Sequence, residues 1–264
     1  MTNDQAEIKK YVQERYGERA RQVAGLEVVS VEDALCCADG SCSTDMDASL
    51  AAFSNLYQQA ELEGLPLEAI AASAGCGNPT ALAGLQPGER VLDLGSGGGI
   101  DCFLAARQVG PEGHVTGLDM TTDMLDLARR NAQNLGIPNV EFIEGEMENI
   151  PMPGASVDVV ISNCVVCLSP DKDAVAREAF RVLSPGGRLH ISDMVALAPM
   201  PQELRNDPQQ WASCVSGADD LDTYLARLTK AGFVDVDVTQ DGPSRAQEGR
   251  PDVASVKVVA YKPS

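Results

Sequence analysis

The chain has 264 residues, and its 44% hydrophobic content is enough to build one substantial core. Its 39 acidic side chains against 20 basic ones give a net charge of −19, which repels nucleic-acid phosphates and anionic lipid headgroups, so we expect neither as a partner. No apolar stretch approaches the roughly 18 residues of a membrane span, and the segment MTNDQAEIKK lacks the apolar core of a signal peptide, which predicts a cytoplasmic protein.

Residues 5–22 predict an amphipathic helix that packs on the main domain as a lid. Apolar side chains recur there at helical spacing, namely Ile8, Tyr11, Val12 and Tyr16. Residues 35–47 turn to Cys, Gly, Ser and Asp, which is the composition of a loop. We therefore expect residues 1–64 to form a helix and a cysteine-rich loop, followed by one domain over residues 65–264.

From residue 90 onward, short β-rich segments alternate with helical periods. The expected strands are 91–94, 114–119, 140–145, 157–162 and 187–193, and the expected helices lie near 100–108, 122–135 and 172–183. This alternation is typical of βαβ units. It predicts an α/β fold with a doubly wound, Rossmann-like, mostly parallel sheet that binds ligands at the carboxyl ends of its strands.

The end of the chain departs from that alternation. An insert at residues 196–219, rich in Pro, Gln and Ser, interrupts it and carries Cys214. A helix near 220–231 then precedes two strands, 234–238 and 255–261, which we expect to form an antiparallel hairpin at the sheet edge.

The segment VLDLGSGGGID at residues 91–101 is a strand followed by a glycine-rich turn that opens a helix. Without a Cβ, Gly95 and Gly97 allow the backbone to turn tightly and to approach a ligand closely. Asp119 ends the second strand roughly 20 residues later, where a carboxylate can accept hydrogen bonds from both ribose hydroxyls of an adenosyl group. The GSGGG spacing differs from the GxGxxG of dinucleotide sites, which favours a nucleoside ligand without a pyrophosphate.

The chain has eight cysteines and only two histidines, His114 and His190, which lie in predicted strands and are interpreted as structural. In a reducing compartment, thiols indicate packing, metal binding or catalysis more than a disulfide framework. Only Cys164 and Cys167 form a CxxC pair, which argues against structural zinc.

Three cysteines are placed to meet at one rim of the predicted sheet. Cys164 ends a strand whose carboxyl end faces the cofactor, and Cys76 and Cys214 reach the same rim from loops. Three thiols brought together from distant segments suit a soft, thiophilic ion. Cys102, beside Phe103 in the helix after the glycine turn, is interpreted as a core residue.

Four segments together resemble the class I S-adenosylmethionine methyltransferases: VLDLGSGGG, LDMTTDML, EGEMENIP and LSPGGRLHISD, between about residues 90 and 193. The resemblance implies a Rossmann-like fold and S-adenosylmethionine as methyl donor. It further implies that the methionine end is lined by Asp93, Gly95, Ser96 and Gly97, the ribose by Asp119 and Met120, and the adenine by Glu146 and Met147.

A second set of segments, GCGNPTAL, LDLGSGGGIDCF, SNCVVCLSPDK and SCVSGA, resembles the arsenite S-adenosylmethionine methyltransferases over most of the chain. That resemblance implies that Cys76, Cys164 and Cys214 bind trivalent arsenic as a trithiolate and that Tyr57 touches the cofactor. Cys167 departs from the family pattern, in which a non-cysteine residue is expected. We interpret it as a spare thiol near the site or as an unimportant substitution, and favour the latter.

Arsenic held by three thiolates keeps a lone pair that can attack the donor methyl in line, so catalysis needs positioning and desolvation and no general base. Methylation oxidises arsenic to the pentavalent state, so a thiol reductant is needed before another round. By the same resemblance an N-terminal cysteine is the redox partner; we favour Cys42, with Cys36 and Cys37 as alternatives, and expect thioredoxin or glutathione to reset the disulfide.

Two other functions stay open on the sequence. One is a class I methyltransferase that acts on a carbon or oxygen of a small organic molecule, with incidental cysteines. The other is a non-catalytic, thiol-rich metalloid-binding protein that has kept the cofactor fold.

Overall fold

The computed structural model describes residues 3–24, 57, 59–73, 78, 84–205, 207–241, 244–247 and 250–264. Four cysteines with predicted roles lie outside these ranges: Cys36, Cys37, Cys42 and Cys76. Within the described ranges, each helix is too short or too polar to cross a membrane.

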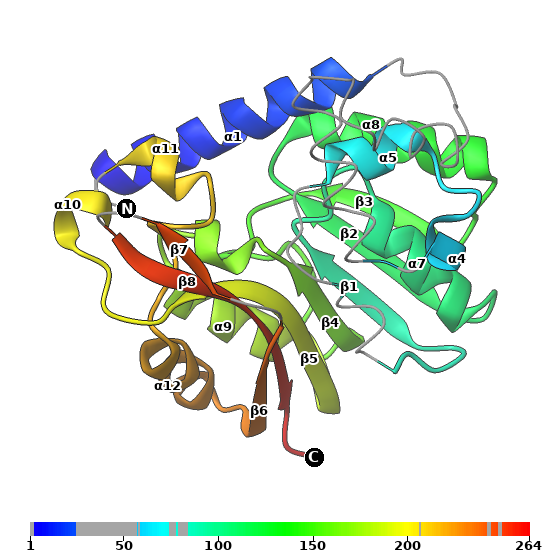
Figure 1. Cartoon of the computed structure of the whole chain (residues 1–264). Coiled ribbons are helices and arrows are strands. Elements are labelled where there is room, and N and C mark those ends of the chain that lie inside the picture. The colour runs from blue at the N-terminus through cyan, green and yellow to red at the C-terminus, as the bar shows by residue number, and fades with distance from the viewer. Residues whose placement is uncertain are drawn as a thin grey trace.

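A mixed sheet lies at the centre of the molecule (Figure 1), with the strand order β3-β2-β1-β4-β5-β8-β6 and with β7 paired to β8. The strands are β1 (Arg90–Leu94), β2 (His114–Asp119), β3 (Val140–Glu144), β4 (Val157–Asn163), β5 (Leu183–Ala196), β6 (Val234–Gln240), β7 (Arg245–Gln247) and β8 (Arg250–Tyr261). Strands β1 to β5 pair in parallel, whereas β8 runs antiparallel to both β5 and β6. The mostly parallel sheet with antiparallel strands at one edge is confirmed; β6 is the outer strand because β8 lies between it and β5.

Helices cover both faces of the sheet. They are α1 (Asn3–Val23), α4 (Gln59–Leu62), α5 (Leu67–Ala72), α7 (Ile100–Val109), α8 (Thr122–Leu135), the 3-10 turn η1 (Val166–Leu168), α9 (Lys172–Val182), α10 (Gln202–Arg205), α11 (Pro208–Trp211) and α12 (Leu221–Ala231). Side chains of β1 alternate between two cores, since Val91 packs with α7 and α8, while Leu92 and Leu94 pack with α9 and α12. The fold therefore has three layers, with the sheet between two layers of helices.

The register aligns the carboxyl ends of the central strands. Leu94 pairs with Leu118 on one side and with Ser162 on the other. The residues that follow these three therefore leave the sheet at the same edge: Gly95, Asp119 and Asn163. Ligand-binding residues of a doubly wound sheet are expected at this edge.

A third apolar cluster lies at that edge, where α1 crosses from α11 to α8 and α5 (Figure 1). The helix predicted at residues 5–22 is present as α1. All four side chains predicted for its apolar face pack against this cluster: Ile8, Tyr11, Val12 and Tyr16. The cluster also contains Trp211 and three cysteines, Cys164, Cys167 and Cys214.

Candidate active site

The glycine turn after β1 is held in place by β2. The backbone N–H groups of Gly95 and Ser96 donate to the Leu118 carbonyl at 2.8 and 2.9 Å. Gly95 has a φ of 72°, and a Cβ there would overlap the side chain of Val165. Only glycine fits this position, both because L-residues avoid that φ and because the next segment packs directly on the backbone.

Asp119 is built into the same turn. Its carboxylate accepts hydrogen bonds from the N–H groups of Gly97 at 2.9 Å and Thr121 at 2.8 Å. Burial raises its pKa, while these hydrogen bonds act in the opposite direction. Since a carboxylate offers about four lone-pair sites, two backbone donors leave Asp119 able to accept further hydrogen bonds from a ligand.

A pocket opens between the glycine turn, the ends of β2 and β4, and α1. Six of the predicted cofactor residues line it: Gly95, Ser96, Gly97, Asp119, Met120 and Met147. Cys164, one of the predicted arsenic ligands, lines the same pocket. Three further predicted residues lie beside this lining and not in it: Asp93, Glu146 and Tyr57.

Asp93 lies beneath the turn in a buried pair with Cys102. The Cys102 thiol donates to Asp93 Oδ2 at 3.3 Å, and both side chains are buried. Burial, reinforced by the neighbouring Asp101 carboxylate, raises the pKa of Asp93 well above its usual range. The prediction that Cys102 belongs to the core is confirmed.

Two pocket residues, Asp101 and Asn163, were not identified from the sequence. The Tyr57 hydroxyl donates to Asp101 Oδ1 at 2.7 Å, and the Asn163 amide donates to Asp101 Oδ2 at 3.1 Å. Burial raises the pKa of Asp101 to about 6. Tyr57 is therefore outside the pocket lining and holds the Asp101 carboxylate in place through a hydrogen bond. Asp101 could have been found from the sequence, because it is an acid in the first turn of the helix that follows the glycine turn, a position that favours negative charge.

Helix α1 forms one side of the pocket through Lys9, Val12 and Tyr16. The Lys9 ammonium contacts the Glu146 carboxylate at 2.8 Å and the Glu148 carboxylate at 3.1 Å. The predicted adenine-bordering residue Glu146 is thus tied to α1 by an ion pair.

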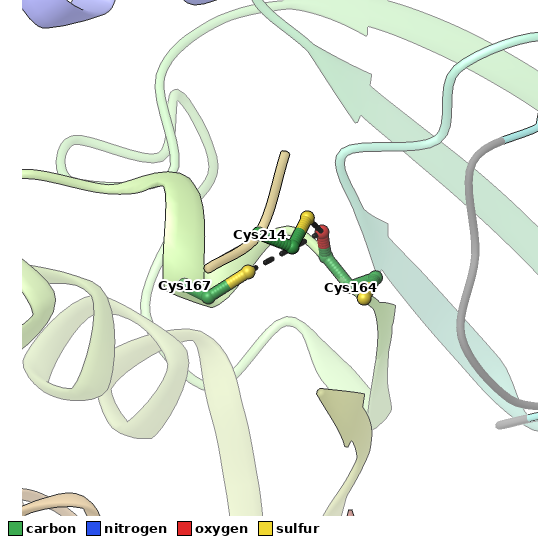
Figure 2. A group of neighbouring side chains, drawn as sticks. All are labelled: Cys164, Cys167 and Cys214. Atoms are coloured by element: carbon green, nitrogen blue, oxygen red, sulfur yellow. Dashed lines mark hydrogen bonds between the residues drawn. The ribbon is translucent and has the colours of Figure 1, made fainter. Parts of the chain in front are cut away.

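Three buried cysteines gather beside the pocket, at the carboxyl end of β4 (Figure 2). The sulfurs of Cys164, Cys167 and Cys214 lie within 4.8 Å of one another, and the residues are 4%, 1% and 8% exposed. The Cys214 and Cys167 thiols both donate to the Cys164 carbonyl oxygen, at 3.4 and 3.7 Å. We call this set the thiol cluster. It brings two predicted ligands together and adds Cys167, while Cys76 lies outside the described residues.

The cysteines of this cluster are in different oxidation states. Cys164 is disulfide-bonded. Cys167 and Cys214 are free thiols. Burial raises the pKa of Cys167 well above its usual range, so this thiol keeps its proton at neutral pH.

The backbone of the thiol cluster is strained. Cys164 and Cys214 have φ angles of 60° and 58°, in the left-handed region that costs an L-residue about 1–2 kcal/mol. A Cβ at Gly217 would overlap the Cys167 carbonyl oxygen, so a glycine lets the insert approach the turn after β4. The Trp211 indole N–H donates to the Leu168 carbonyl at 2.9 Å and fixes the same contact.

Charged groups lie behind the thiol cluster. The buried Asp193 carboxylate of β5 accepts the Cys167 backbone N–H at 2.9 Å, and burial raises the Asp193 pKa to about 6. The buried Lys172 ammonium lies 5.0 Å from the centroid of the Trp211 ring. Neither histidine lines the pocket, and burial lowers the pKa of His190 to about 4, so it is neutral.

Comparisons with known proteins agree with this geometry. Residues 85–241 match a family model described as a methyltransferase domain. An arsenite methyltransferase of Halobacterium salinarum is 43% identical over 89% of this chain and 59% of its own length, and one of Aquipseudomonas alcaligenes is 42% identical over 64% and 50%. The chain thus spans between half and three fifths of the length of these two curated relatives.

A solved structure extends the likeness to three dimensions. The arsenic(III) S-adenosylmethionine methyltransferase of Chlamydomonas reinhardtii is 35% identical to this chain, with a TM-score of 0.64. The match covers 82% of this chain and 74% of that one.

Proposed function

This chain belongs to the family of arsenite S-adenosylmethionine methyltransferases, and from that membership we propose that it transfers the methyl group of S-adenosylmethionine to trivalent arsenic held by cysteine thiolates. One observation carries the proposal. Cys164 belongs both to the lining of the pocket and to the thiol cluster. Arsenic bound at Cys164 would therefore lie directly beside a cofactor in that pocket.

The pocket residues suit S-adenosylmethionine, which combines a nucleoside with a cationic amino-acid end. Asp119 would accept hydrogen bonds from the ribose hydroxyls, with Met120 beside it, and Met147 would offer an apolar surface to the adenine, bordered by Glu146. The glycine turn, Gly95 to Gly97, would hold the methionine end near the buried Asp93. Asp101, held by Tyr57 and Asn163, would supply a carboxylate for the methionine ammonium group.

The proposed arsenic ligands are Cys76, Cys164 and Cys214. Trivalent arsenic enters as arsenous acid, and each thiol that binds gives its proton to a departing hydroxide, which leaves as water. The bound arsenic would keep its lone pair and attack the methyl carbon of S-adenosylmethionine, while the bond from that carbon to the sulfonium sulfur would break and S-adenosylhomocysteine would leave. No proton moves in this step, which accords with two histidines that stand away from the pocket. The chain contributes position and exclusion of water.

Pentavalent arsenic formed by the transfer must be reduced by two electrons before it can react again. We propose that thiols of this chain supply them by forming a disulfide, with Cys42 as the redox partner, Cys36 and Cys37 as alternatives, and thioredoxin or glutathione as the external reductant. The disulfide at Cys164 supports a site whose thiols take part in oxidation and reduction.

The test is an incubation of the purified chain with arsenite, S-adenosylmethionine and a thiol reductant, followed by separation of the arsenic species. We expect methylated arsenic and S-adenosylhomocysteine in proportion. Cys164→Ser should lower turnover more than about 100-fold, because a hydroxyl is a poor ligand for a soft ion, while cofactor affinity measured by calorimetry stays within about twofold.

The other functions give different results in the same incubation. Arsenite that binds and quenches Trp211 without consumption of cofactor would indicate a sequestering protein. If neither arsenite binding nor methylated arsenic is found, the result would favour a methyltransferase that acts on a small organic molecule.

A further inference from the structure

Cys167 is the cysteine that departs from the pattern expected for the family. Three contacts fix the position of this residue. The turn η1 brings its thiol back to the Cys164 carbonyl oxygen, Asp193 accepts its N–H, and Gly217 lets the Cys214 loop pack against its carbonyl. Of the two interpretations of Cys167 from the sequence, this geometry favours a thiol near the site over an unimportant substitution.

Cys167 and Cys214 form a close pair of free thiols. Their sulfurs lie within 4.8 Å of each other, whereas two thiolates that share one tetrahedral zinc ion through bonds of about 2.3 Å are about 3.8 Å apart. A shift of about 1 Å in the position of either sulfur would bring the pair to that separation. In the same structure Cys164 is held in a disulfide, so this pair is the part of the cluster that remains reduced.

The two free thiols of the thiol cluster match a particular arsenic species. Trivalent arsenic makes three bonds, so arsenous acid can take three thiolates, whereas an arsenic that already carries one methyl group has two positions left. Methylarsonous acid and two thiols give a methylarsenic dithiolate and two molecules of water, with no change in oxidation state. A pair of thiols is therefore a complete ligand set for the monomethylated species.

We propose that Cys167 is an arsenic ligand that pairs with Cys214, so that the site can hold monomethylated trivalent arsenic while Cys164 is in its disulfide. The inference rests on the proposed function, because it assigns the binding of a partly methylated intermediate to the same site. It deepens that function by giving the intermediate a binding place that needs neither Cys76 nor reduced Cys164. The pair lies in one apolar cluster with Trp211 and Val12, which excludes water from the bound arsenic.

The experiment uses the full chain with five cysteines replaced by serine, namely Cys36, Cys37, Cys42, Cys76 and Cys164. This variant keeps only Cys102, Cys167 and Cys214. Methylarsonous acid is titrated while Trp211 fluorescence and free thiols are measured. We expect binding of one equivalent with the loss of two thiols, and a further Cys167→Ser change should weaken it at least about tenfold.

The matched control is Cys102→Ser on the same background, because Cys102 is an equally buried thiol that bonds to Asp93 and stands outside the cluster. It should leave the affinity for methylarsonous acid unchanged. Equal affinity with and without the Cys167 thiol would overturn the proposal, even if the unmodified chain methylates arsenite. If the unmodified chain does not methylate arsenite but the thiol pair still binds methylarsonous acid, the proposed function is contradicted and the proposal on Cys167 is not.

A second comparison covers the case in which the five-serine variant does not fold. Cys76→Ser/Cys164→Ser and the same variant with Cys167→Ala added are titrated with the same probe, after circular dichroism has shown equal helix content. Weaker binding by the triple variant, by at least about tenfold, supports the proposal, and equal binding overturns it.

Discussion

The cofactor pocket and the thiol cluster share one edge of the sheet but are built in different ways. The pocket forms around a contiguous turn, whose glycines and backbone N–H groups are fixed by β2. The thiol cluster is assembled from β4, η1 and the insert, with two cysteines in the left-handed region and ionisable groups buried behind them. The comparison indicates that the pocket depends on local backbone geometry, whereas the cluster depends on long-range packing and on the oxidation state of its thiols.

The largest effect is expected from a change at Gly217, which should impair the thiol cluster and spare the cofactor pocket. In Gly217→Ala the new methyl group would overlap the Cys167 carbonyl oxygen, so the insert must move away from η1. We expect arsenite methylation to fall more than about 100-fold, because a displacement of about 1 Å at a reacting centre has that effect, while cofactor affinity stays within about twofold.

The control for this change is Gly136→Asn at the end of α8. Gly136 has a φ of 63°, a Cβ at this position would have no neighbouring atom within 4 Å, and asparagine tolerates that backbone conformation. The substitution should leave both measurements unchanged. A Gly217→Ala variant with full methylation activity would show that the insert does not position Cys214.

A change at Asp119 is expected to weaken cofactor binding and to leave arsenite binding unchanged. In Asp119→Ala the ribose loses its proposed acceptor and the N–H groups of Gly97 and Thr121 lose theirs. We expect S-adenosylmethionine to bind about 10- to 100-fold more weakly in calorimetry, which corresponds to about one hydrogen bond to a charged group. Arsenite affinity, followed by Trp211 fluorescence, should not change; a matching loss there would mean that the two regions are not independent.

A smaller effect is expected from pH. Asp101 has a pKa of about 6, and a cationic methionine end favours its ionised form. Cofactor affinity is therefore full about one unit above pH 6 and falls as the pH drops through 6, by up to about tenfold per unit below it. Asp101→Asn should weaken binding at pH 7 and flatten the pH profile, whereas Asp126→Asn, an exposed change on α8, should leave it as it is. A profile in the Asn variant as steep as in the unmodified chain would assign the titration to another group.

The difference between the two regions also explains what the sequence could predict. The glycine turn and Asp119 were predicted because a strand, a turn and the next strand's carboxyl end follow each other within one βαβ unit. Asp101 and Asn163 were missed because their place in the pocket depends on the register of β1 against β4 and on Tyr57, which comes from a distant segment.

The cysteines show the same limit. Cys164 and Cys214 were expected at one rim, and the structure brings them together. The nearness of Cys167 to both could not be predicted, since it depends on the direction of η1 and on the close approach of Gly217 from the insert. Side chains that meet through a turn and an insert leave no periodic signal in the sequence.

The most direct test is a crystal structure of the chain with arsenite and S-adenosylhomocysteine, in which anomalous scattering locates the arsenic. The account predicts an arsenic bound to the sulfurs of Cys164 and Cys214, on the side of the pocket that Cys164 lines and facing the cofactor's sulfur. An arsenic bound elsewhere on the chain, with the cofactor in place and these two sulfurs without it, would contradict it.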